Sequence, residues 1–177
     1  MKKILLTLFL LVSFLKADIT EYFPKLDGRI VDQVNLISSP VKNDINTILE
    51  EHEKETSNQI VVVILDSLHD YQIEDYSYQL GRYWEVGQKD KNNGILLVIA
   101  MKEKKIRIEV GYGLEGALTD KIAYEIINYT IKPNFKASQY ELGILKAINE
   151  IILTIKGKKK KKIVDDEFDA KSNELIS

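Results

Sequence analysis

The stretch EVGYGLEGALTD, residues 109–120, places three glycines close to the carboxylates of Glu115 and Asp120. Glycine adopts backbone conformations that other residues avoid, and it lets main-chain groups approach a ligand closely. A phosphate would favour bare amides and cationic side chains, whereas Glu115, Asp120 and the nearby Asp90 offer negatively charged oxygens. Oxygen-rich acidic sites bind hard cations. The stretch therefore favours a divalent cation, Ca²⁺ or Mg²⁺, as its ligand.

A purely structural interpretation of the same stretch stays open. Glycines often make a tight turn between a strand and a helix, and Asp120 would then only favour the helix N-terminus. The segment Asn92-Asn93-Gly94 could likewise be a plain turn. Tyr112, which lies between two of the glycines, is either an exposed contact or an aromatic lid over the core.

Two continuous apolar runs, residues 59–65 and 94–101, predict central strands that are covered on both faces. A helix predicted near residues 73–84 separates them, which implies a right-handed parallel crossover. Residues 105–110 alternate between apolar and charged side chains after a short turn, and this pattern is typical of an antiparallel hairpin. Because the hairpin reverses direction, we expect residues 109–120 to lie beside residues 89–94.

Three further helices complete the predicted fold. One starts at Ser39-Pro40 and ends near Thr56, a second covers residues 122–131 and is terminated by Pro133, and a third opens with the capping box Ser138–Glu141. Residues 23–39 are interpreted as an extended arm. Helices on both faces of the sheet predict an α/β fold, a three-layer α/β/α sandwich around a small mixed sheet with a parallel βαβ unit and an antiparallel hairpin.

The first 17 residues have the pattern of a secretory signal peptide, with two lysines, an apolar run over residues 4–15 and then Ala17. An uncleaved anchor is the alternative, although a spanning helix needs about 20 apolar residues. Cleavage near Ala17 would export the protein to the periplasm or the medium. It would also lower the formal charge from −2 to −5 by removing three lysines, and an acidic body disfavours nucleic acid as a partner.

The remaining chain predicts one domain, residues 18–156, followed by a charged tail, residues 157–177. The chain has no cysteine, so packing must stabilise the domain, and a bound ion could add to that stability. The tail joins a lysine run to an acidic stretch and holds too little apolar surface to fold alone. We interpret it as a disordered solvated segment, with peripheral contact between its lysines and anionic lipid as the functional alternative.

Several separate segments of the chain resemble the TPM domain, a family of exported and thylakoid-lumen proteins. They are LDGRIVDQVNLIS, YWEVGQKDKNNGILLVIA, RIEVGYGLEGALTD and PNFKASQYELGI. The resemblance covers about residues 23–155 and implies an α/β/α sandwich with an acidic cleft that binds a divalent metal in some members. Carried to matching positions, it implies a metal site formed by Asp32, Asn93, Glu115 and Asp120. Asn92 and Asn93 make this turn less acidic than family versions with aspartate, and the C-terminal membrane helix of bacterial relatives is replaced by the lysine tail.

Two functions are open for such a protein. The favoured hypothesis is a non-catalytic exported module, or scaffold, that binds an unidentified envelope protein. The alternative is a metal-assisted acid phosphatase acting on phosphomonoesters, an activity that the resemblance implies, with Asp32 or Asp120 as nucleophile or base. Neither histidine supports it strongly, because His52 lies on the apolar side of a predicted helix and His69 is expected to be a solvated loop residue.

Overall fold

The structure is a computed structural model that describes residues 18–157. The predicted signal peptide and the lysine-rich tail beyond Gly157 lie outside the described residues. In the part of the chain from residue 18 to residue 157, no helix is long and apolar enough to cross a membrane.

A four-stranded mixed sheet forms the centre of the molecule, in the order β1 (Ile30–Asp32), β2 (Gln59–Leu65), β3 (Gly94–Ala100) and β4 (Lys105–Val110). The first three strands are parallel, and β4 pairs antiparallel with β3. The predicted crossover from β2 to β3 and the predicted hairpin are therefore both confirmed. Nearly every residue of β2 and β3 is buried, which agrees with their continuous apolar sequences.

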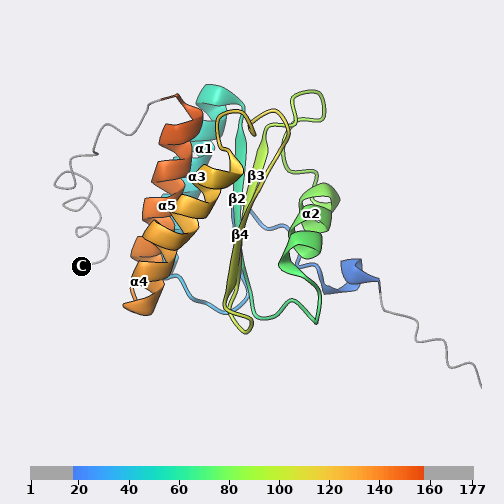
Figure 1. Cartoon of the computed structure of the whole chain (residues 1–177), viewed down its shortest axis with the longest axis vertical. Coiled ribbons are helices and arrows are strands. Elements are labelled where there is room, and N and C mark those ends of the chain that lie inside the picture. Colours follow the sequence, from blue (N-terminus) through green and yellow to red (C-terminus); the bar gives the residue numbers. More distant parts are fainter. Residues whose placement is uncertain (1–17, 158–177) are drawn as a thin grey trace, which may run out of the picture.

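Helices cover both faces of this sheet (Figure 1). The α2 helix (Ile73–Tyr83) lies on one face, and α1 (Ser39–Thr56), α3 (Asp120–Glu125), α4 (Lys132–Lys136) and α5 (Tyr140–Ile155) lie on the other. Alternate residues of β2 divide between two apolar clusters: Ile60, Val62 and Ile64 pack with α1 and α5, whereas Val61, Val63 and Leu65 pack with α2. The predicted three-layer sandwich is confirmed. A short helix, η1 (Ile19–Tyr22), precedes β1.

The segment interpreted as an extended arm contributes a strand of its own. β1 has only three residues, so its sequence cannot show a period, and it pairs in parallel with Val62, Val63 and Ile64 of β2. The prediction of an arm was incomplete because the strand is shorter than the pattern that would reveal it.

The prediction that Pro133 terminates a helix was wrong. The chain passes from α3 through a π-helical segment, η2 (Ile126–Ile131), directly into α4, which contains Pro133. Proline has no N–H to donate to the carbonyl four residues earlier, and its ring clashes with that carbonyl. The wider π-helical turn just before Pro133 accommodates the ring, so the helix continues.

The predicted capping box at the start of α5 is also wrong. Gln139 is the N-cap residue, it makes no capping hydrogen bond, and Ser138 has a left-handed φ of 60°. Glu141 instead accepts a hydrogen bond from the backbone N–H of Ser38 at 2.6 Å. The carboxylate that was expected to cap its own helix thus joins the start of α5 to the start of α1.

Candidate functional site

The loop after β4, residues 111–119, lies where the hairpin geometry predicted it. Because β4 runs antiparallel to β3, the end of β4 pairs with the beginning of β3, and Val110 lies opposite Ile95. The amide of Gly111 donates to the carbonyl of Gly94 at 2.8 Å, and the amide of Gly113 donates to the carbonyl of Asn92 at 3.0 Å. We call residues 111–119 the signature loop.

Two of the three glycines are needed for close packing of the signature loop on the turn before β3. A Cβ atom at Gly113 would overlap the carbonyl oxygen of Lys91, and one at Gly111 would overlap that of Asn92. Neither glycine has a positive φ, so conformational freedom does not explain them. Gly116 has nothing within 4 Å of the position of a Cβ atom. The glycines therefore dock one loop on another, which favours the structural interpretation of their spacing.

Leucines hold the same loop to the core. Leu114 and Leu118 are buried in the cluster beneath α1 and α5, and Leu118 donates its amide to the carbonyl of Leu114 at 2.8 Å. Thr119 then caps α3 by accepting a hydrogen bond from the amide of Ile122 at 3.4 Å. Between these anchors Tyr112 is 80% exposed, so it is a surface residue and not a lid over the core.

Glu115 and Asp120 are both exposed. Asp120 is the first residue of α3, where its negative charge interacts favourably with the positive end of the helix dipole. The carboxylate of Glu115 lies on the surface of the signature loop, and that of Asp120 lies just after the loop. They remain available to a ligand from solvent.

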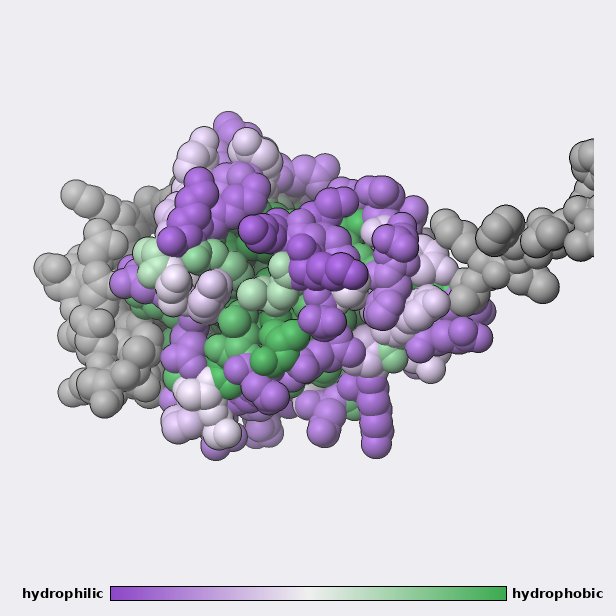
Figure 2. Space-filling model, turned by 90° about the horizontal axis from the view of Figure 1, so that it is seen from below, coloured by the Kyte–Doolittle hydropathy of each residue, from purple (hydrophilic) through white to green (hydrophobic). Residues whose placement is uncertain are grey.

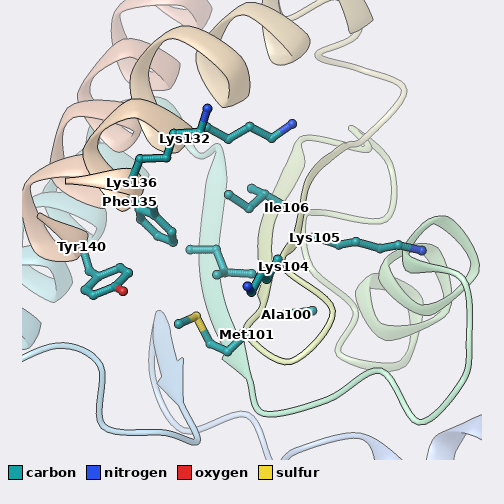
Figure 3. A pocket seen from close by; sticks show the side chains of 10 residues that line it. Ala100, Met101, Lys104, Lys105, Ile106, Lys132, Phe135, Lys136 and Tyr140 are labelled. Atoms are coloured by element: carbon teal, nitrogen blue, oxygen red, sulfur yellow. The ribbon is translucent and has the colours of Figure 1, made fainter. Parts of the chain in front are cut away.

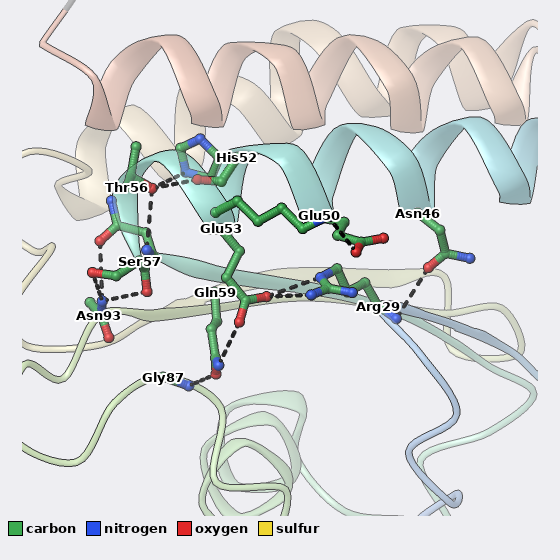
Figure 4. A network of polar contacts seen from close by, with 12 residues as sticks. Arg29, Asn46, Glu50, His52, Glu53, Thr56, Ser57, Gln59, Gly87 and Asn93 are labelled. Atoms are coloured by element: carbon green, nitrogen blue, oxygen red, sulfur yellow. Dashed lines mark hydrogen bonds and ion pairs between the residues drawn. The ribbon is translucent and has the colours of Figure 1, made fainter.

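Asn93 is buried and has a structural role. Its side-chain amide donates to the carbonyl of Ser57 at 2.7 Å (Figure 4). Its side-chain oxygen accepts from the amide of Gln88 at 2.8 Å. Its backbone carbonyl also accepts from the amide of Gln59 at 3.0 Å. Asn93 therefore ties the start of β3 to the start of β2, and its oxygen is already occupied by a donor.

A line of polar contacts extends this network along α1 (Figure 4). Gln59 accepts from the amide of Gly87 at 2.6 Å and donates to Glu53 at 3.0 Å. Glu53 in turn forms an ion pair with Arg29 at 2.8 Å. These contacts join α1 and β2 to the segment before β3, on which the signature loop docks.

Asp32 lies at the other end of the sheet. Its Oδ1 accepts from the amides of Val34 and Leu36, and its Oδ2 accepts from the amide of Ile37 and pairs with Lys42 at 2.9 Å. A carboxylate has about four lone-pair positions, so these four donors saturate it. Burial raises the pKa of Asp32, but the hydrogen bonds from Ile37, Lys42 and Leu36 and the charge of Lys42 outweigh burial and hold the pKa below its usual value.

The four residues of the expected metal site are therefore not brought together. Asp32 pairs with Ile64 at the carboxyl end of β2, whereas Asn93 and the signature loop lie beside Gln59 at its amino end. Five residue steps, from Gln59 to Ile64, separate the two ends, a distance of about 16 Å. Among residues 18–157 no group of three or more acidic or histidine side chains could hold a metal ion. The residues do not fit one shared ion, and only Glu115 and Asp120 keep accessible oxygens.

The two histidines take the places that the sequence predicted. His52 is 3% exposed on the inner side of α1; burial, and then the charge of Lys156, lower its pKa against an opposing effect of Glu55. His69 is exposed and stacks on Tyr22 with ring centroids 4.2 Å apart.

A feature that sequence reasoning missed is a cavity of about 420 Å³ between the β3–β4 hairpin and α4. Its lining comes from three separate segments of the chain, so no single motif indicates it.

Comparison with known proteins agrees with this fold. A family model of the TPM domain matches residues 30–154. A solution NMR structure of the N-terminal domain of a P. gingivalis protein is 31% identical, with a TM-score of 0.67, and the match covers 72% of this chain and 82% of that chain. The BA42 protein of the psychrophilic bacterium Bizionia argentinensis is 19% identical, with a TM-score of 0.61, covering 74% of this chain and 91% of that one.

A third structure, the N-terminal domain of a Corynebacterium glutamicum protein, is 16% identical with a TM-score of 0.55, and the match covers 78% of this chain and 86% of that chain. At this identity, as for BA42, the likeness is one of fold alone. The search of curated proteins finds no match.

Proposed function

Because the chain belongs to the TPM domain family, we propose that it is an exported, non-catalytic binding module whose contact surface is the signature loop. One observation carries the proposal: Tyr112 is 80% exposed, yet the glycines on both sides of it are hydrogen-bonded to Asn92 and to Gly94 at the start of β3. The backbone beneath this aromatic side chain is thus fixed before any partner arrives.

A fixed, exposed tyrosine suits protein recognition for two reasons. Tyrosine is enriched among the residues that contribute most to binding at protein interfaces. A loop that is already ordered loses little conformational entropy on association, so more of the contact energy remains as affinity. The leucines that anchor the loop and the buried network at Asn93 supply that order. The proposed partner is a protein of the cell envelope, the compartment that the N-terminal sequence predicts.

Replacing Tyr112 tests this proposal. We expect Tyr112→Ala to weaken the recovery of an envelope partner by at least tenfold while leaving the melting temperature unchanged, since the side chain is largely solvated. Tyr129→Ala is the matched control, because Tyr129 is 73% exposed on η2, outside the signature loop. The readout is quantitative co-purification from envelope fractions of cells that make each variant. Equal recovery by wild type and Tyr112→Ala, or equal losses in both variants, would contradict the proposal.

The cation part of the proposal is confined to Glu115 and Asp120. Ca²⁺ prefers six to eight oxygen ligands, and two exposed carboxylates supply few of them, so we expect weak binding, on the order of millimolar. A calcium titration followed by two-dimensional NMR should shift the signals of residues 113–121 in wild type and much less in Glu115→Gln, with Glu74→Gln as the exposed control on α2. Shifts centred on Asp32 or Asn93, or no shift at all, would refute this placement.

The phosphatase alternative is tested by measuring hydrolysis of a phosphomonoester by the same protein. Asp32 or Asp120 would be the nucleophile or base of that reaction, and the oxygens of Asp32 are already bound by three backbone amides and by Lys42, so Asp120 is the one of the two that can be tested. Calcium-loaded wild type that hydrolysed a phosphomonoester faster than Asp120→Asn would restore this alternative. Equal rates of hydrolysis by the two proteins would leave the binding module as the proposed function.

A further inference from the structure

The cavity at the hairpin end of the sheet lies between side chains of the β3–β4 hairpin and side chains of α4 and the start of α5 (Figure 3). Ile99, Met101 and Ile106 of the hairpin, whose side chains share the apolar cluster on this face of the sheet, form an apolar floor. Phe135 and Tyr140 form the opposite wall, and their rings meet edge to face with centroids 5.1 Å apart. Its volume of about 420 Å³ lies within the usual range for small-molecule sites, about 300–1,000 Å³.

The helix that closes this cavity owes its position to the π-helical turn. Because η2 leads into α4 without a break, Lys132, Phe135 and Lys136 follow one another along the wall of the cavity. Asn134 strengthens the junction by donating to the carbonyl of Thr130 at 2.7 Å. π-Helical turns occur frequently at functional sites. Here the turn and Pro133 carry the helix over the hairpin, so that an aromatic ring and two lysines face the same space.

Positive charge surrounds the apolar floor. Lys104 of the hairpin turn and Lys132 and Lys136 of α4 line the cavity, and none of its lining residues is acidic. Lys132 donates to a neutral partner, the side-chain oxygen of Asn128, at 2.8 Å. A fourth lysine, Lys105, reaches toward α2, where it donates to Gln72 at 3.3 Å. In the view from below, exposed hydrophobic residues (green) lie directly beside strongly hydrophilic residues (purple) (Figure 2).

We propose that this cavity binds a small amphipathic anion of the single-chain acyl type, a medium-length alkyl carboxylate. The alkyl chain would lie on the floor formed by Met101 and Ile106, against the ring of Phe135, and the carboxylate would reach the lysines at the rim. Met101 suits such a ligand because its side chain is flexible and polarisable. A bare inorganic anion would leave the apolar floor uncovered. An amphipathic cation would be repelled by the positive charges of Lys104, Lys132 and Lys136.

This site is separate from the proposed contact surface. The cavity lies at the turn between β3 and β4, whereas the signature loop follows the far end of β4. An acyl anion could therefore bind without touching Tyr112. Failure of one proposal leaves the other intact.

Titration of the protein with laurate and with dodecyltrimethylammonium, both below their critical micelle concentrations, tests the proposal. The two amphiphiles have similar chains and opposite charges. NMR shifts locate the site and calorimetry gives the affinity. We expect laurate to shift the signals of Met101, Ile106 and Phe135 and to bind at least tenfold more tightly than the ammonium compound.

Variants separate the charge from the apolar floor. Lys104→Gln/Lys136→Gln should bind laurate at least tenfold more weakly, and Met101→Gln should also weaken it. Lys25→Gln/Lys121→Gln is the matched control, because both lysines are exposed and lie outside the cavity; it should bind like wild type. All substituted lysines are exposed, so the variants should fold normally.

Four outcomes would overturn the proposal. They are an absence of laurate shifts at the cavity, equal binding of the two amphiphiles, equal loss in the two lysine double variants, and the same shifts with inorganic phosphate, which would indicate an anion site without an apolar requirement. Shifts at these residues with anionic vesicles but not with free laurate would assign the face to a membrane surface instead.

Discussion

Gly113→Ala is expected to destabilise the fold by about 3 kcal/mol or more, whereas Gly116→Ala is expected to be tolerated. The two positions lie three residues apart in the same loop. At Gly113 the added methyl group would overlap the backbone oxygen of Lys91, while at Gly116 it would meet no atom within 4 Å. Backbone cannot move aside as a flexible side chain can, so the first variant must separate the signature loop from the turn before β3.

Urea unfolding followed by circular dichroism measures both changes. Gly116 has no positive φ, so alanine can also reduce the entropy of the unfolded chain there, and a gain of a few tenths of a kcal/mol up to about 1 kcal/mol is expected. A Gly113→Ala protein as stable as wild type would show that the loop is not docked as described. A large loss at Gly116 would show that an unseen contact lies there.

Asp32→Asn is expected to lower the free energy of unfolding by about 3 kcal/mol. The side chain of Asp32 has no exposed surface, and it accepts hydrogen bonds from three backbone amides as well as pairing with Lys42. An asparagine of the same shape can accept at only one of its two terminal atoms. It therefore leaves amide donors and the ammonium group without partners. Asp66→Asn is the control, since Asp66 is exposed and follows β2 at the same end of the sheet.

The same carboxylate predicts a pH dependence. Its pKa in the folded state is held below the ordinary value of 3.8, so the folded protein holds this carboxylate's proton less tightly than the unfolded chain does. Its contribution is fully present above the unfolded pKa and is lost as the pH falls through the folded pKa. The stability difference between wild type and Asp32→Asn should thus stay constant from about pH 7 to pH 5 and shrink below about pH 4. A difference that grew on acidification would contradict this sign.

Sequence patterns predicted those strands in which burial is continuous or alternates regularly along several residues. The buried strands β2 and β3 are continuous apolar runs, and β4 alternates because one face is wet. The three-residue β1 offers no such pattern, and the helix through Pro133 depends on a local π-helical adjustment. The strand β1 is set by pairing with β2, which is distant in sequence, and the helix through Pro133 is set by the geometry of a single turn.

For the candidate site, the hairpin topology predicted which segments lie side by side, but the expected metal ligands do not lie together. The hairpin correctly placed the signature loop beside residues 89–94. Asp32 was assigned to the same site through the family resemblance, but parallel pairing of β1 with β2 puts it at the opposite end. Nothing in the letters Asn92-Asn93-Gly94 indicates that one amide is buried in a hydrogen-bond network and the other is exposed.

The central claim, that the signature loop is a contact surface, is tested most directly by crosslinking in living cells. A photoactivatable phenylalanine analogue would replace Tyr112 in one protein and the similarly exposed Tyr129 in another. The proposal predicts a discrete protein adduct after irradiation from position 112, lost when Gly113→Ala is added, and little or none from position 129. No adduct from position 112, or the same adducts from both positions, would contradict it.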